Sequence, residues 1–263
     1  MKRRCPAAGA LSALSALGAL GALCALLAPA HAAEVCTAVA DAATGKLLLE
    51  RGDCRTRVTP ASTFKIAISL MGYDAGFLKD AHAPLLPYRP GYVDWQPAWR
   101  APADPARWMR DSVVWYSQQV TLALGPARFG AYVRQFGYGN QDVAGDAGHD
   151  GLTLSWIGSS LQISPLEQLG FLGKLVGGQL GVSGQAYDMT AALTRYGTVD
   201  GWELHGKTGA SSGLGWYVGW ATKDGRAVTF ARLVRSDDTQ PKGMSAGVWA
   251  REAFLSEFAG LIP

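Results

Sequence analysis

The sequence contains few of the residue types that bind metals, with four histidines and four cysteines among 263 residues. Beyond the N-terminal segment, His82, His149 and His205 show no ligand spacing with one another or with the cysteines. A glycine-rich loop of the phosphate-binding type is also missing. The sequence therefore predicts no metal site and no bound cofactor.

Charge is scarce as well, since only 17% of the residues are charged and the net charge is +3. This excess comes from Lys2, Arg3 and Arg4; without them, 21 basic residues balance 21 acidic residues. Because the basic and acidic residues are equal in number, the net charge does not favour binding to a nucleic acid or to an anionic membrane surface. Because 48% of the residues are hydrophobic, the chain can bury a sizeable core, in one large domain or two interlocked ones.

Long hydrophobic runs are missing except for an Ala/Leu-rich segment from Leu11 to Leu27. It follows the basic N-terminus and precedes Ala30-His31-Ala32, a small-x-small cleavage site, as in secretory signal peptides. The alternative is a membrane anchor, which the small residues and the cleavage site disfavour. Leu23 before Cys24 is too large for a lipoprotein cleavage site, so we expect no lipid anchor. We predict that residues 1–32 are removed during export to the periplasm.

Two cysteines, Cys36 and Cys54, remain after this cleavage. They flank two strand-like runs, 37–40 and 46–50, that surround a turn containing Thr44-Gly45. In an exported protein such a pair indicates a disulfide, and a bridge across a hairpin is geometrically easy. Two independent thiols are the alternative.

The rest of the chain changes from helix signals to strand signals from Gly201 on. A stretch rich in proline and aromatic residues, 73–105, suggests a packed irregular wall. The other expected segments are a helix from Pro60 to near Gly72, a helix opened by Asp111-Ser112, a helix over 126–136, a Gly/Asp-rich loop over 137–151, a helix from Ser164 with a capping box, strands over 202–209, 215–220 and 226–234, and a helix over 246–259. This order predicts an α/β fold of the α+β type, with a sheet from both chain ends (about 33–65 and 186–263) and an inserted helical region (about 66–185).

Ser62 and Lys65 are the first candidate catalytic pair. Pro60 favours a helix start, because its fixed φ and missing N–H cost nothing in the first turn. The two side chains then share one helix face, where the amine could activate the hydroxyl as a nucleophile near free backbone N–H groups. The apolar run from Ile66 to Leu70 favours the uncharged amine. The alternative is that Ser62 only caps the helix and Lys65 is solvated.

Three further clusters could complete a site around this pair. Ser112 could pass a proton to a leaving group, or it is only a helix cap. Tyr138 and Asn140 lie on a glycine-flanked loop, which is typical of functional side chains but also of a simple turn. Lys207-Thr208-Gly209 lies on an expected strand, where the glycine allows a ligand to approach the backbone. Its lysine could equally be an edge charge that discourages aggregation.

Taken together, these motifs have an informative order along the chain. They run Ser62-Thr63-Phe64-Lys65, Ser112-Val113-Val114, Tyr138-Gly139-Asn140, Trp156 and Lys207-Thr208-Gly209. This set resembles the class D (oxacillinase-type) serine β-lactamases, and the S-D-N motif of class A is absent. The resemblance covers essentially the whole mature chain. It implies one catalytic domain with the fold of serine β-lactamases and penicillin-binding proteins, in which helices flank an antiparallel sheet.

The resemblance also implies an activity, the hydrolysis of β-lactam antibiotics, which confers resistance. Ser62 would be acylated, and Lys65, N-carboxylated by carbon dioxide from bicarbonate, would be the general base for acylation and deacylation. Only an uncharged amine reacts with carbon dioxide, so an apolar site suits this chemistry. The indole N–H of Trp156 would donate to the carbamate, and Val114 would shield it.

The remaining roles concern the substrate. By the resemblance, Ser112 relays a proton toward the β-lactam nitrogen, and Lys207 with Thr208 binds the substrate carboxylate. Backbone N–H groups of Ser62 and Ala210 form the oxyanion hole. The substrate-binding candidates are Thr208, Gly209, Ala210, Tyr138 and Asn140, of which the last two are expected to shape the site.

Two departures from the family pattern affect the substrate cleft. Relatives usually carry a basic residue early in the last helix, where this sequence has Ala246. Lys242 or Arg251 could substitute, but neither is in phase with that position, so we expect carboxylate recognition to rest more on Lys207 and Thr208. The short hairpin over 210–215 predicts a more open cleft on that side.

Two other functions use the same motifs. A β-lactam-sensing domain stays acylated on the serine, but such sensors are carried on membrane-spanning segments. A D,D-peptidase shares the S-x-x-K and K-T-G motifs but is not expected to have the Trp156 segment. We therefore expect an enzyme with a small-molecule β-lactam substrate, acting as a monomer or a homodimer.

Overall fold

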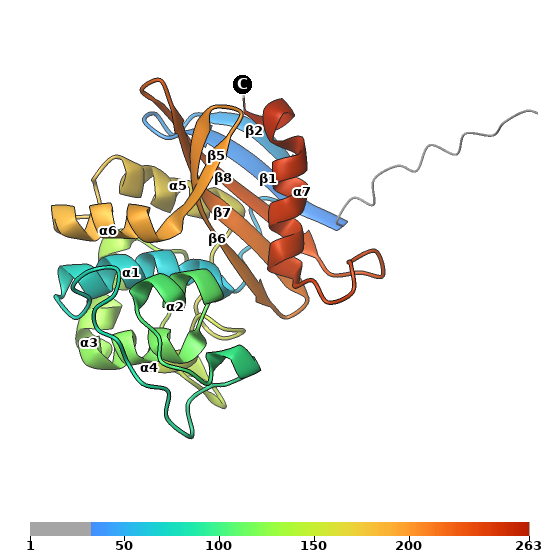
Figure 1. The fold of residues 1–263 in the computed structure, drawn as a ribbon. Helices are drawn as coiled ribbons and strands as arrows, with labels where there is room; N and C mark the ends of the chain where they lie inside the picture. The colour runs from blue at the N-terminus through green and yellow to red at the C-terminus, as the bar shows by residue number, and fades with distance from the viewer. Residues whose placement is uncertain (1–32, 263) are drawn as a thin grey trace, which may run out of the picture.

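The computed structural model describes residues 33–262, so the signal peptide predicted for residues 1–32 lies outside the described residues. Its centre is a six-stranded antiparallel sheet with the order β2-β1-β8-β7-β6-β5 (Figure 1). The strands are β1 (Ala33–Asp41), β2 (Leu47–Gly52), β5 (Arg195–Val199), β6 (Trp202–Ser211), β7 (Leu214–Lys223) and β8 (Arg226–Arg235). Both chain ends contribute to this sheet, which confirms the predicted α+β arrangement.

Helices cover both faces of the sheet. The closing helix α7 (Ala246–Leu261) lies on one face, and the inserted helical region lies on the other (Figure 1). That region contains η1 (Ala61–Phe64), α1 (Lys65–Asp74), η2 (Pro97–Trp99), α2 (Pro105–Asp111), α3 (Val114–Phe136), β3 (Gly145–Asp146), β4 (His149–Asp150), α4 (Gly151–Leu154), α5 (Pro165–Val176) and α6 (Gly184–Thr194). The predicted capping box is present at the start of α5.

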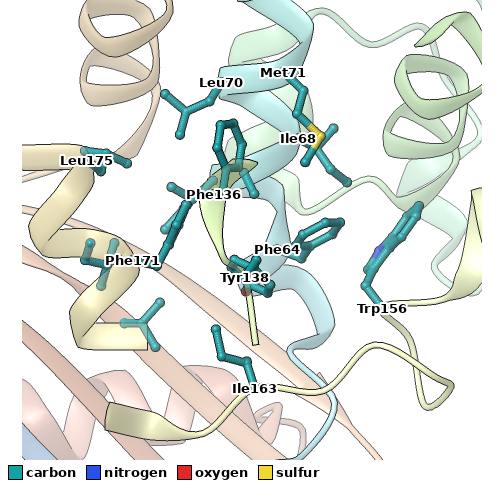
Figure 2. Packing of buried hydrophobic residues seen from close by; sticks show 14 of the residues in the cluster. Phe64, Ile68, Leu70, Met71, Phe136, Tyr138, Trp156, Ile163, Phe171 and Leu175 are labelled. Atoms are coloured by element: carbon teal, nitrogen blue, oxygen red, sulfur yellow. The ribbon is translucent and has the colours of Figure 1, made fainter. Parts of the chain in front are cut away.

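The strand alternation divides the core into two layers. On β7, Tyr217 packs with the α7 layer, whereas its neighbours Trp216 and Val218 pack with the helical region. In the helical layer, Phe64 lies between Tyr138 and Trp156 (Figure 2). The residues next to Ser62 are therefore fixed by aromatic packing.

The predicted disulfide is present. Cys36 on β1 bridges to Cys54 just beyond β2, with the two Cα atoms 5.1 Å apart. Both residues are buried. The bridge ties the two strands of the N-terminal hairpin together next to the segment that leads to Ser62.

The prediction that Ser112 opens a helix is wrong. Helix α2 begins earlier, at Pro105, where the Asp104 side chain accepts a hydrogen bond from the Arg107 N–H. Ser112 instead ends this helix in the left-handed conformation, with φ 58° and ψ 34°, and α3 begins at Val114. The αL geometry at a helix C-terminus explains the sharp change of direction there.

The helix predicted over 126–136 forms the second half of α3. Gly125, with φ 72° and ψ 164°, interrupts the helical backbone immediately before Pro126. The proline removes one N–H donor and disfavours helical backbone in the residue before it, so the break falls here.

The helical region continues past the expected boundary of about residue 185. Ser183 caps α6 by accepting a hydrogen bond from Ala186 N–H, and the helix runs to Thr194. The edge strand β5 follows directly and pairs with the first residues of β6. This strand lacks a clear polar–apolar alternation, which is the signal on which strand prediction depends.

Candidate active site

The site begins at the turn where η1 passes into α1. This short 3-10 turn positions Ser62, and Lys65 is the first residue of α1. The predicted contact is present, with Lys65 Nζ 3.1 Å from Ser62 Oγ. The sequence spacing of three residues is enough to bring both groups to one face of the turn.

Lys65 is fully buried. Burial, and to a lesser degree the charge of Lys207, lowers the pKa of the Lys65 amine well below its ordinary value of 10.5. Both effects act in one direction, because an apolar surrounding and a neighbouring cation each disfavour the protonated form. The site therefore favours an uncharged amine beside the serine hydroxyl.

Trp156 closes the apolar side of this site. It is fully buried, and its ring lies 5.6 Å from Phe64 and 6.1 Å from Phe129 (Figure 2). The Trp156 carbonyl accepts hydrogen bonds from Ala61 N–H and from the Thr59 hydroxyl, which fixes the segment against η1. Its Nε1 atom, however, is buried without a hydrogen-bond partner. A buried indole N–H normally has an acceptor, so this donor fits a nearby anion.

A cavity of about 840 Å³ opens above Ser62. It brings together Ser62, Ser112, Val114 and the Thr208–Ala210 segment of β6. Residues of the aromatic-rich stretch also line it: Trp95, Gln96 and Trp99. The irregular wall expected from the sequence is thus one side of the cavity.

The edge of β6 borders this cavity beside the serine. Strand β5 pairs with β6 only at residues 202–205, so the 207–210 edge has a strand partner on the β7 side alone. An added Cβ at Gly209 would come 3.1 Å from Ser62 N and Pro60 O, so glycine permits this close approach. The geometry suits backbone N–H groups of η1 and β6 to a developing oxyanion.

Lys207 lies at the inner end of this edge. Its Nζ donates a hydrogen bond to Thr208 O at 2.9 Å, and the side chain is buried. Burial, followed by the nearby Arg251, lowers the pKa of Lys207 to about 7. Its charge is thus sensitive to pH in the neutral range.

Two basic residues line the cavity even though their sequence positions are out of phase with Ala246. Lys242 and Arg251 both line it, although neither occupies the position of Ala246. Ala246 instead packs against the backbone at Gly215, where a Cβ would have no room. The Arg251 guanidinium is paired with Glu252 and lies over the Tyr196 ring, so it borders the cavity as part of an ion pair.

Tyr138 and Asn140 do not line the cavity. Tyr138 is fully buried, and its hydroxyl accepts a hydrogen bond from Gln168 Nε2 at 3.2 Å. The Asn140 side chain donates to Ser160 O at 2.7 Å and accepts from Gln162 N–H. Both residues make structural hydrogen bonds, which agrees with the expectation that they shape the site, and their assignment as substrate-binding residues stays a prediction.

Gln168 is a supporting residue that sequence reasoning missed. Its Nε2 donates to Thr63 Oγ1 at 3.0 Å as well as to Tyr138, and the side chain is buried. It thereby joins α5 to η1. A polar residue within an apolar helix stripe was the available signal.

Within residues 33–262, no three histidine, cysteine, aspartate or glutamate side chains gather as metal ligands. None of the helices in this range is both long and apolar enough to cross a bilayer.

Comparisons with known proteins agree with this geometry. Residues 35–255 match the model of the penicillin-binding protein transpeptidase domain. β-Lactamase OXA-9 of Klebsiella pneumoniae is 45% identical over 248 residues, which cover 86% of this chain and 88% of that protein. β-Lactamase OXA-1 of Escherichia coli is 35% identical, with 75% of this chain and 74% of that protein covered.

Solved structures show the same relationship. The crystal structure of OXA-427, a class D β-lactamase, is 44% identical with a TM-score of 0.80, and the match covers 86% of this chain and 99% of that one. The buried lysine beside an accessible serine, the β6 edge and these similarities lead to one conclusion. This chain is a member of the class D serine β-lactamases.

Proposed function

We propose that this chain hydrolyses β-lactam antibiotics of the penicillin and oxacillin class and thereby confers resistance. The observation that carries the proposal is the 3.1 Å contact between the buried Lys65 amine and the Ser62 hydroxyl, at the floor of a cavity large enough for a drug-sized molecule. Its relatives are named β-lactamases.

In the proposed mechanism Lys65 carries a carboxyl group. The uncharged amine forms an N–C bond with carbon dioxide and releases one proton, which leaves an anionic general base. The depressed pKa of Lys65 favours this step, and the unpaired Nε1–H of Trp156 offers a donor to the new anion. Val114 lies at the cavity wall, where its side chain would limit access of water.

The chain's own residues would then carry out acyl transfer. The base takes the proton of Ser62 Oγ, the oxygen attacks the lactam carbonyl, and backbone N–H groups of Ser62 and Ala210 stabilise the oxyanion. Ser112 delivers a proton to the departing nitrogen as the lactam C–N bond breaks, and the protonated base returns to Ser112 the proton that it took from Ser62. In deacylation the base takes a proton from water, the oxygen of that water attacks the acyl carbonyl, the acyl–Oγ bond breaks and Ser62 Oγ takes the proton back. Lys207, Thr208 and Arg251 would hold the substrate carboxylate.

A single assay separates this proposal from its alternatives. The mature protein is incubated with a chromogenic cephalosporin, with and without added bicarbonate. Sustained turnover that rises with bicarbonate supports the proposed enzyme. One stoichiometric burst would indicate a sensor that stays acylated, and peptide cleavage without lactam turnover would indicate a D,D-peptidase.

We also propose that the protein acts in the periplasm after removal of residues 1–32. The basic start, apolar segment and Ala30-His31-Ala32 site support this. Mass spectrometry of protein from the periplasmic fraction should show a mature N-terminus at Ala33. An intact Met1 terminus on the active protein would contradict the proposal.

The Trp156→Phe variant should lose most of its carbamate. Phenylalanine keeps an aromatic ring against Phe64 but removes the only N–H donor that the side chain has. Carbon-13 NMR after equilibration with labelled bicarbonate should show the carboxyl-lysine signal in the parent and little of it in the variant. Trp249→Phe, in the α7 layer, is the matched control and should keep the signal. An equal signal in both variants would exclude this role of Trp156.

Substrate binding should weaken as the pH rises through about 7. Lys207 is protonated below its pKa of about 7 and uncharged above it, so its attraction for the substrate carboxylate is lost on the alkaline side. A charge-assisted hydrogen bond contributes about 1.5–3 kcal/mol, so KM should rise about tenfold or more between pH 6 and pH 9. In Lys207→Arg the cation persists over this range, and the rise in KM should be absent. The same rise in both proteins would assign it to another group.

A further inference from the structure

A second cavity, of about 180 Å³, adjoins the main one and is lined in part by Lys207. Residues of α2, the junction of α6 and β5, β6, β7 and α7 line it. Thr208, Arg110 and Arg251 line both cavities. A water molecule occupies about 30 Å³ in the liquid, so the space holds about six waters or one small ion with its shell, and not a drug-sized molecule.

The lining of this second cavity carries charge of one sign. Arg110, Arg195, Lys207 and Arg251 contribute to it from four different elements, and no carboxylate belongs to the lining. Each arginine has an acidic partner outside the lining: Asp111, Glu203 and Glu252. Such convergence of cations in a concave site attracts an anion.

Tyr217 supplies an independent indication of a ligand. It lines the same cavity, is 1% exposed, and its hydroxyl has no hydrogen-bond partner. The ring is held 5.1 Å from Phe230 and 5.7 Å from Phe254 and crosses Gly206, where an added Cβ would come within 2.9 Å of the hydroxyl oxygen. A buried hydroxyl without a partner is rare, and this one can donate to an acceptor in the cavity.

We propose that this cavity binds a small oxyanion of the sulfate or hydrogen carbonate class, held by the Tyr217 hydroxyl and the guanidinium groups of Arg195 and Arg251. The oxygens of such an ion are arranged in a tetrahedron or a plane and accept hydrogen bonds from several directions. This arrangement matches the planar fork of an arginine and a phenolic O–H. Chloride or water would satisfy fewer of these donors. Ser62 does not belong to the lining of this cavity, and occupation of the site needs no turnover.

Isothermal titration calorimetry with sodium sulfate, at constant ionic strength and pH 7, tests the proposal on the resting enzyme. Sulfate is the probe because it cannot carboxylate Lys65, and the measurement does not depend on β-lactam hydrolysis. The parent should show saturable binding to one site. Arg195→Gln and Tyr217→Phe should each weaken sulfate binding about fivefold or more.

Arg55→Gln is the matched control, because Arg55 is also an exposed arginine paired with a glutamate but lies outside the cavity. It should bind sulfate like the parent. The Arg195 side chain is 55% exposed, so its replacement leaves the core packing intact, and this variant serves even if Tyr217→Phe folds poorly. Absence of saturable binding in the parent, or equal affinity in Arg195→Gln and Arg55→Gln, would overturn the proposal.

Discussion

Replacing Ser62 with alanine abolishes covalent labelling by penicillin. The Ser62 hydroxyl is the nucleophilic group that accepts a hydrogen bond from Lys65 Nζ, so no acyl-enzyme should form without it. Loss of a serine nucleophile lowers kcat by about 10⁵- to 10⁶-fold. Intact-protein mass spectrometry after incubation with benzylpenicillin should show the mass of one added drug in the parent and the unmodified mass in Ser62→Ala.

The control for this experiment is Ser183→Ala. Ser183 caps α6 and does not line the active-site cavity, so its loss affects stability by about 1 kcal/mol and leaves labelling intact. Stoichiometric labelling of Ser62→Ala would mean that a different residue is the nucleophile. The proposed mechanism would then fail at its first step.

The Lys65→Met variant should acylate slowly and deacylate hardly at all. Methionine fills a similar volume in the buried site but cannot take a proton or capture carbon dioxide. General-base catalysis contributes about 10²- to 10⁴-fold to each proton-transfer step, and both steps depend on this residue. Stopped-flow kinetics should show a slow burst followed by accumulation of the acyl-enzyme, and bicarbonate should no longer raise the rate.

A loss of folding should not be the cause of the low activity of Lys65→Met. An uncharged polar group is removed from an apolar site, so the free energy of unfolding should not fall on this account. Lys79→Met, at an exposed position, is the matched control and should turn over substrate at the parent rate. Parent-like deacylation by Lys65→Met would show that another group activates the water.

The features that sequence reasoning predicted well are local in the chain. Ser62 and Lys65 meet because three residues of a helical turn bring their side chains to one face. The Cys36–Cys54 bridge follows from a hairpin whose two ends must be adjacent. The Ser164 cap of α5 depends only on Glu167, three residues later.

The wrong prediction at Ser112 arose because the same residue type can begin or end a helix. Ser112 is a good helix cap by composition, but Asp104 and Pro105 had already started a helix that ends there. Tyr138 and Asn140 lie on a glycine-flanked loop, and the sequence did not show that Tyr138 packs against Phe64 or that Asn140 donates a hydrogen bond to Ser160 O.

By itself, the order of motifs along this chain determined the family and the pairing of the Ser62 hydroxyl with the Lys65 amine, because these depend on residue identity and on spacing within one turn. Only the tertiary structure decided that Arg251 lines the cavity and that the Lys65 side chain is fully buried. It also decided that four basic side chains line one cavity beside β6. Burial and charge clustering sum contributions from segments far apart in sequence, and no local pattern encodes how those segments pack.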